Sequence, residues 1–225
     1  MNGKAIIKFL VVIAAIIGLF AYFIQPLAGS LKQGLDLQGG THIVLEAEDS
    51  ATGTADNDAV ERAKQILERR INEMGLSEPL VQREGARRII IELPGVKDPD
   101  EAIKRIGKTA VLEFKNDQGQ TVMTGDDLKD AKEELGQNKQ PLVAIELSDE
   151  GAKKFADLTS KNIGRRIAIT LDGKELTNPV VQQAITGGKA TISGSQSLEE
   201  AKDLAILLRS GALPVKILSL IHISE

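Results

Sequence analysis

The sequence predicts an α+β protein made of one N-terminal transmembrane helix followed by an exported domain with a small insertion. Two observations support this fold class. An uncharged apolar run extends from Phe9 to Ile24. After residue 40, short segments with strand-like alternation are interleaved with segments that carry apolar residues at helical spacing. The roughly 195 residues beyond the apolar run are enough for one large or two small domains.

The apolar run is long enough to cross a bilayer. A helix from Ile6 to Ile24 would be about 28 Å long, close to the thickness of the hydrocarbon layer. Lys4 and Lys8 are the only charged side chains before the end of the run, and such residues stay on the cytoplasmic side. We therefore expect residues 1–30 to form a cytoplasmic stub and an anchor, and the main domain to be extracytoplasmic.

A cleaved secretory signal is the alternative to an anchor. Ala28-Gly29-Ser30 has the small residues of a cleavage site. However, the apolar run is longer than the core of a signal peptide, which has about 7 to 15 residues. Tyr22 and Phe23 near its outer end are typical of residues at a membrane interface. These features favour an uncleaved anchor in the cytoplasmic (inner or plasma) membrane.

Composition argues against several classes of function. Outside the anchor only Phe114 and Phe155 are aromatic, which disfavours a surface that stacks on bases or sugars. Beyond Lys8 there are 26 basic and 32 acidic residues, a net charge of −6, and they are interspersed. This pattern does not indicate a nucleic-acid partner. The chain has no cysteine, so disulfides, thiolate nucleophiles and cysteine-based metal sites are excluded.

Residues 41–115 predict alternating strands and helices. A strand over 41–48 precedes a helix with a capping box at Asp58 and Glu61 and an end at Gly75. Further segments follow as strands at 80–83 and 87–93, a helix that starts at Asp98-Pro99 and ends at Gly107, and a strand at 109–115. This β-α-β-β-α-β order is that of the ferredoxin-like (βαββαβ-type) arrangement.

Residues 116–141 differ from their surroundings. They are rich in Gln, Asn, Asp and Gly, and Leu128, Ala131 and Leu135 predict one helix. We interpret this segment as a small insertion.

A similar order recurs from residue 142. The predicted elements are a strand at 142–147, a helix capped by Ser148, a hairpin at Asp172-Gly173, a short helix between Asn178-Pro179 and Gly187-Gly188, a strand at 190–193, and a helix with a Ser197–Glu200 capping box that ends at Gly211. The two stretches with this order of elements correspond either to two subdomains or to two halves of one sheet, and the sequence leaves both arrangements open.

No catalytic or cofactor-binding pattern is present. Gly107-Lys108 and Gly188-Lys189 lack the glycine that a phosphate-binding loop needs five residues earlier. His42 and His222 have no neighbouring ligand set for a metal, and there is no Gly-x-Ser-x-Gly nucleophile elbow. We therefore expect no enzymatic activity, no cofactor and no metal.

One glycine-rich segment lies between the anchor and the first predicted strand. Its residues are Gly34, Leu35, Asp36, Leu37, Gln38, Gly39 and Gly40. Glycines permit positive φ or a close backbone approach, and an aspartate side chain bonds nearby backbone amides. The segment is either a tight turn that leads into the strand or a joint that couples the exported domain to its membrane helix.

This segment resembles the signature of SecD, the membrane subunit that assists the bacterial Sec protein-export channel. Four other stretches, in the order of the family, are similar to SecD as well: residues 91–96, 110–114, 168–173 and 207–214. The resemblance extends over about residues 5 to 217. It implies a transmembrane helix, an exported domain with a ferredoxin-like base and an inserted head, and further membrane helices beyond.

The resemblance also implies partners and a mechanism. SecD-like proteins pair with SecF and use the proton-motive force to draw preproteins out of the SecY-SecE-SecG channel in the lipid bilayer, through movement of the exported domain. By this resemblance, residues 31–115 and 142–214 are the two parts of the base, and residues 116–141 are a head that is short for the family.

Two features depart from the family pattern. The membrane helices that are held to carry protons would follow residue 214, so no proton site is assigned. We expect residues 215–225 to be a truncated tail, since residues 218–225 resemble translated sequencing-adapter read-through, and His222 then has no role.

Two other functions stay open on the sequence alone. One is a membrane-anchored extracytoplasmic binding, sensor or assembly module without proton coupling. The other is a periplasmic hydrolase of ferredoxin-like fold, which would need an anion-binding loop with a placed arginine.

We predict that Gly39→Val or Gly40→Val, placed in an otherwise intact subunit, slows the export of secreted proteins. A β-branched side chain cannot adopt the positive φ or the close approach that paired glycines permit. Pulse-chase measurement of preprotein processing checks the prediction, and normal export rates in both variants would contradict a coupling role for the segment.

Overall fold

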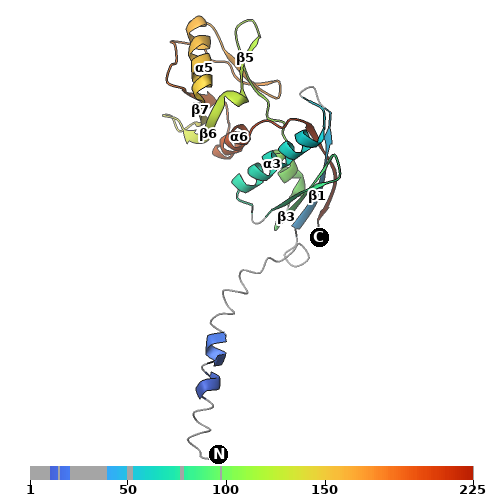
Figure 1. Ribbon diagram of the computed structural model, residues 1–225. Coiled ribbons are helices and arrows are strands. Elements are labelled where there is room, and N and C mark those ends of the chain that lie inside the picture. The colour runs from blue at the N-terminus through green and yellow to red at the C-terminus, as the bar shows by residue number, and fades with distance from the viewer. Residues whose placement is uncertain are drawn as a thin grey trace, which may run out of the picture. The chain divides into compact units, whose positions relative to one another are not determined.

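The computed structural model describes residues 11–14, 16–20, 40–49, 53–76, 79–96 and 98–224 (Figure 1). The chain divides into two compact units, residues 1–38 and residues 39–225. In the first unit, residues 11–14 and 16–20 are helical. No helix among the described residues is both long enough and apolar enough to cross a membrane. Most of the anchor predicted from Ile6 to Ile24 lies outside the described residues.

A four-stranded antiparallel sheet forms the first part of the larger unit. Its strand order is β11-β1-β3-β2, and β1 pairs with both β3 and β11. The elements of this part are β1 (Gly40–Glu48), α3 (Asn57–Glu73), β2 (Leu80–Glu84), β3 (Arg88–Pro94), α4 (Pro99–Ile106) and β11 (Lys216–Ser224). The sheet therefore brings the strand with the highest residue numbers next to the first strand.

The first core lies between this sheet and its helices. Alternate residues of β1 are buried, and Ile43 and Leu45 are fully enclosed. Helix α3 contributes Leu67 and Ile71 to the same cluster. Complete burial of one such side chain stabilises the fold by about 1.5–3 kcal/mol, so this apolar layer is the main source of stability for the first part.

Two smaller sheets form the second part of the larger unit. Their strand orders are β10-β7-β6 and β5-β4-β8-β9. The strands are β4 (Leu112–Lys115), β5 (Thr121–Thr124), β6 (Leu128–Leu135), β7 (Pro141–Leu147), β8 (Ala168–Leu171), β9 (Lys174–Thr177) and β10 (Lys189–Ser193). The helices are η1 (Gly125–Asp127), α5 (Asp149–Lys161) and α6 (Leu198–Ser210). The prediction of a chain that mixes helices and strands is confirmed.

A second core joins these two sheets. The rings of Phe114 on β4 and Phe155 on α5 meet edge to face, with centroids 6.0 Å apart. Ala201, Ala205 and Leu208 of α6 belong to the same cluster. Helix α6 also contacts α3 of the first part, and Figure 1 shows it next to that helix. Helix α6 is therefore shared by both parts.

Several predicted ends of helices are confirmed. Asp98, Ser148 and Ser197 are the N-caps of α4, α5 and α6, and each side chain accepts a hydrogen bond from the first turn. Gly211 follows α6 with a φ of 90°. The N-cap of α3, however, is Asp56, whose carboxylate accepts from Ala59 N at 2.7 Å.

Two predicted elements are wrong, and a third is shorter than predicted and belongs to another sheet. The strand predicted at 109–115 begins only at Leu112 and pairs with β5 and β8, while β11 takes the fourth place in the first sheet. The helix predicted around Leu128 to Leu135 is strand β6, because pairing with β7 overrides the helical spacing of its apolar residues. Residues 178–187 contain no helix, since Pro179 O and the backbone of Val181 bond to residues 164–167.

Residues 116–141 do not form a separate insertion. Strands β5 and β6 pair with β4 and β7. Met123 and Ala131 are buried in the second core together with residues from 142–208. The segment is polar because β-turns and exposed strand faces make up most of it, and it belongs to the same body as residues 142–208.

Arg70 joins the two parts of the larger unit. Its side chain is fully buried on α3, and its guanidinium donates four hydrogen bonds to uncharged oxygens. Nη1 donates to Ile106 O at 2.6 Å and to Lys108 O, Nη2 donates to Gly211 O at 2.8 Å, and Nε donates to Ser210 Oγ at 3.1 Å. These acceptors lie on the two chain segments that connect the first core to the second. Burial lowers the pKa of Arg70 to about 10.

The two connecting segments are also held to each other and to the second part. Leu213 N donates to Thr109 O at 2.8 Å. The carboxylate of Asp172, at the tip of the β8–β9 hairpin, accepts from Ala110 N at 3.1 Å and from Val111 N at 2.9 Å. Ala110 has a φ of 61°, so the chain turns sharply where it leaves the first part.

Two ion pairs fix α6 to the helices of the first part. Arg105 on α4 pairs with Asp203, and Arg209 pairs with Glu73 at the end of α3, with Nε 3.0 Å from the carboxylate. Each pair raises the pKa of its arginine, chiefly through the hydrogen bond to the carboxylate.

We predict that Arg70→Met lowers the free energy of unfolding by about 3 kcal/mol or more, because each buried acceptor that loses its donor costs about 1–3 kcal/mol. Urea unfolding followed by circular dichroism measures the loss. Arg69→Met is the matched control, because Arg69 is the exposed neighbour on the same helix. A loss no larger than that of the control would contradict the role of Arg70.

Candidate functional site

The glycine-rich segment predicted as a coupling joint lies almost entirely outside the described residues. Only Gly40 is described, and it is the first residue of β1, where it pairs with Pro94. The segment therefore leads directly into the central strand of the first sheet. The roles predicted for Gly34 to Gly39 stay predictions.

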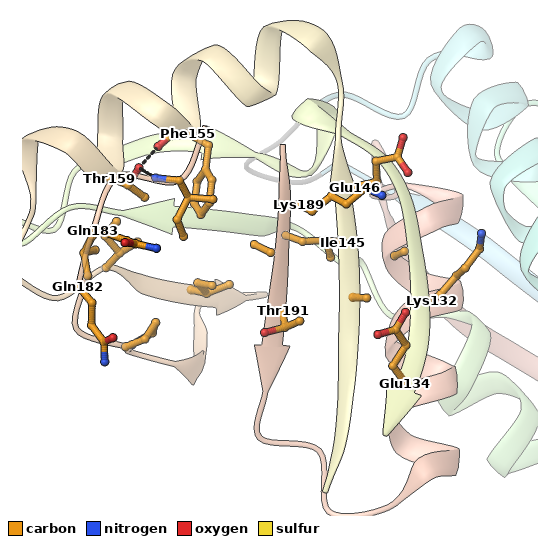
Figure 2. Close-up of a pocket in the computed structure, with 18 of the residues that line it drawn as sticks. Lys132, Glu134, Ile145, Glu146, Phe155, Thr159, Gln182, Gln183, Lys189 and Thr191 are labelled. Atoms are coloured by element: carbon orange, nitrogen blue, oxygen red, sulfur yellow. Dashed lines mark hydrogen bonds between the residues drawn. The ribbon is translucent and has the colours of Figure 1, made fainter. Parts of the chain in front are cut away.

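The second part contains a groove with a volume of about 740 Å³. Figure 2 shows residues of four elements around it: Phe155 and Thr159 on α5, Lys189 and Thr191 on β10, Ile145 and Glu146 on β7, and Lys132 and Glu134 on β6. A volume in this range is typical of ligand-binding clefts, which have about 300–1,000 Å³. The groove is therefore the candidate functional site.

Two walls define the groove. One wall is the three-stranded sheet, whose strand β10 lies at its edge. The other wall is built where residues 179–181 pair with residues 164–167: Gly164 N donates to Val181 O at 2.8 Å, and Val181 N donates to Arg165 O at 2.9 Å. This pairing fixes the second wall to the segment that precedes β8.

The inner surface of the groove is aliphatic. Ile145, Ile167, Ile169 and Val181 are buried and line it, and Phe155 contributes the only aromatic ring among the lining residues. Val180, at the second wall, is 47% exposed. Such a surface binds apolar side chains by removing apolar area from water rather than by ring stacking.

Helix α5 fixes the segment that forms the mouth of the groove. Thr159 is buried on α5, and its hydroxyl donates to Phe155 O at 2.7 Å and accepts from Ile185 N at 3.0 Å. Figure 2 shows both bonds as dashed lines. One hydroxyl therefore ties the loop that carries Gln182 and Gln183 to the helix.

The rim of the groove is charged, and its charges nearly cancel. Asp130, Glu134 and Glu146 face Lys132 and Lys189 among the lining residues. Hydrogen bonds to lysines lower the pKa of two of these carboxylates: Lys132 binds Asp130 at 2.9 Å, and Lys129 binds Glu146. The described residues hold no cluster of acidic or histidine side chains suited to a metal. The groove thus combines an aliphatic inner surface with a nearly neutral, charged rim.

Arg209 connects the groove to the first part. Its Nη1 donates to Ala131 O at 3.0 Å, and Ala131 lines the groove on β6. The same guanidinium pairs with Glu73 on α3 at 2.9 Å and lies 3.9 Å from Asp130. Arg209 on α6 therefore links strand β6 to helix α3.

Comparison with known families assigns the chain. The sequence profile of the SecDF P1 head subdomain matches residues 103–215, that of the N-terminal P1 domain of protein translocase subunit SecDF matches residues 60–119, and that of the SecD/SecF GG motif matches residues 31–51. The head profile contains the whole groove.

Similar proteins agree with these matches. The protein translocase subunit SecD of Acidaminococcus fermentans is 57% identical over 217 residues, which are 96% of this chain and 52% of the relative. SecD of Dictyoglomus turgidum is 46% identical over 83% of this chain and 47% of its own length. A crystal structure of SecDF in a super-membrane-facing form has a TM-score of 0.77 at 40% identity, over 86% of this chain and 31% of that one.

A second solved structure covers a shorter protein. It is described as SecDF, a membrane component that enhances protein export, and it matches with a TM-score of 0.71 at 39% identity over 79% of this chain and 97% of that one. The matches define a subunit of a protein translocase. The chain belongs to the SecD/SecDF family. It spans about half the length of the curated SecD relatives it matches first.

Sequence reasoning missed the groove. Its lining residues come from segments between 130 and 191, and each segment by itself has the pattern of an ordinary half-buried strand or loop. One signal was present: Val180, Val181 and Ile185 are apolar residues in a Gly- and Gln-rich stretch, where solvated loops have few.

We predict that Thr159→Val accelerates amide exchange at Ile185 about ten-fold, because the N–H of Ile185 loses the hydroxyl oxygen that accepts its hydrogen bond and the loop opens more often. Hydrogen exchange followed by mass spectrometry measures it, with the amide of Ile169 as an internal reference. Ser160→Ala, which removes an exposed hydroxyl from the next residue, is the control. Equal exchange rates at Ile185 in both variants would show that the hydroxyl of Thr159 does not hold the loop to α5.

Proposed function

We propose that this chain is the N-terminal portion of a SecD-type subunit of the bacterial Sec preprotein translocase, and that its groove holds segments of preproteins. The observation that carries the proposal is the groove itself: an aliphatic cleft with a balanced rim, inside the segment that matches the SecDF head profile. Such a surface accepts many unfolded sequences, as a protein that assists export must.

The division of the domain follows the two cores. We assign residues 40–106 together with 213–224 to the base, and residues 107–212 to the head. The strand order β11-β1-β3-β2, with helices after the first and third strands of the chain, supports a ferredoxin-like base. The proposed head is therefore about four times the length of the insertion that the sequence predicts.

The proposed location is the cytoplasmic membrane. The apolar run before the GG motif supports an anchor with a cytoplasmic N-terminus and an extracytoplasmic main domain. SecF, the SecY-SecE-SecG channel, translocating preproteins and the lipid bilayer are the proposed partners, and the proton-motive force is the proposed energy source. In this proposal the chain acts by conformational change and is not an enzyme.

Site-specific photo-crosslinking tests the proposal. A photoreactive amino acid at Gln182, which is exposed at the mouth of the groove, is expected to crosslink a preprotein stalled in the channel. The same amino acid at Arg69, exposed on α3, is the matched control and is expected to give no crosslink. The variants are made in the full-length subunit within the membrane.

Two results would contradict the proposal. Equal crosslinking from both positions would show that contact with the preprotein is not confined to the groove. No crosslink from Gln182, together with normal export when Val180→Asp places a charge in the groove, would favour the anchored sensor or assembly module.

A further inference from the structure

The exposed edge of β10 is a second recognition element in the groove. Strand β10 lies at the end of the three-stranded sheet and pairs only with β7 among the described residues. Its residues Lys189 to Thr191 line the groove. One long wall of the groove is thus a strand edge rather than a surface of side chains alone.

The hydrogen-bond pattern identifies which backbone groups face the groove. Leu147 N donates to Gly188 O at 2.8 Å, so Leu147 is bonded toward β10. In an antiparallel pair, bonded positions alternate along each strand. Ala190 and Ile192, opposite Ile145 and Val143, therefore bond to β7.

The positions between them point the other way. Lys189 and Thr191 direct their N–H and C=O groups away from β7, and no backbone group among the described residues bonds to them. Beyond Thr191 the edge is closed, because Ser193 Oγ lies 3.4 Å from Thr177 Oγ1 on β9. Two residues thus offer four backbone groups inside the groove.

Only one side chain of this edge, that of Lys189, is of a kind that protects natural edge strands. Natural edge strands are commonly guarded by proline, by a bulge or by charges. Strand β10 pairs with β7 without a register shift and contains no proline, and Lys189 is its only charged residue. The opposite edge of the same sheet, β6, carries Lys132, Glu133 and Glu134 and a bulge.

We propose that an extended segment of a polypeptide client binds by adding a strand to the edge of β10, with every second side chain on the aliphatic surface of the groove. This inference rests on the proposed function and specifies how the groove recognises its client. Backbone hydrogen bonds give strand addition an affinity that does not depend on sequence, and the pockets add a preference for alternate apolar residues. The nearly neutral rim adds no selection by charge.

A labelled peptide tests strand addition. The probe is a fluorescein-labelled octapeptide of alternating valine and threonine, and its partner is the same peptide N-methylated at residues 4 and 5, which blocks both strand edges and keeps every side chain. Binding to the full chain in detergent micelles is measured by fluorescence anisotropy. We expect the N-methylated peptide to bind at least about ten-fold more weakly, since it loses hydrogen bonds and meets steric hindrance.

A matched pair of variants tests the same edge from the protein side. Thr191→Pro removes an N–H that faces the groove and leaves the β10–β7 bonds intact, as proline is tolerated at such edge positions. Thr191→Val keeps that N–H and removes only the hydroxyl. We expect Thr191→Pro to bind the unmodified peptide about ten-fold more weakly than Thr191→Val does.

The outcomes separate the two proposals. If Val180→Asp weakens binding of the peptide but N-methylation and Thr191→Pro do not, strand addition is overturned and the groove remains a client site. If the unmodified peptide does not bind and Gln182 gives no crosslink in the translocase, both proposals fail. If Thr191→Pro lowers the thermal midpoint of the protein, its weaker binding could come from loss of structure. The comparison of the N-methylated and unmodified peptides on the parent protein then decides whether strand addition occurs.

Discussion

The burial of one guanidinium constrains how the whole larger unit is built. An arginine enclosed without a carboxylate partner is costly unless its N–H groups find acceptors. For Arg70 these acceptors come from Ile106 and Lys108 on one connecting segment and from Ser210 and Gly211 on the other. If either segment moved away from α3, the buried charge of Arg70 would lose hydrogen-bond acceptors. Both segments that connect the two cores are therefore fixed at the same point.

This constraint gives α6 its double role. The helix ends at Ser210, next to the arginine, so its C-terminal turn is held against α3 while Ala201 and Ala205 pack into the second core. Arg105 pairs with Asp203 in the middle of α6, and Arg209 pairs with Glu73 near its C-terminal end; both ion pairs are partly exposed and individually weak. The buried guanidinium of Arg70 is therefore the strong tie between α6 and the first part, and the two ion pairs add to it.

The sequence predicted the elements that local chemistry decides and missed those that pairing decides. The caps at Asp98, Ser148 and Ser197 could be found because each needs only residues within one turn. The identity of β6 could not, because its apolar residues have helical spacing and its strand state depends on β7. The place of β11 beside β1 spans about 170 residues of chain, and no local pattern reports such a pairing. The groove is formed by these long-range pairings, so it could not be predicted from the sequence either.

The scarcity of aromatic residues agrees with the proposed function, in which the surface of the groove has to release the chain that it binds. Tight and specific interfaces rely on a few buried aromatic or arginine anchors. The groove offers one ring, that of Phe155, and otherwise aliphatic area and backbone groups. In the proposed function, weak contacts of low specificity let the groove hold a passing chain at many successive positions and release it from each. Directional movement then has to come from outside the groove, and the hydrogen bonds of Arg70 and Arg209 are the connections through which we propose that the head transmits force.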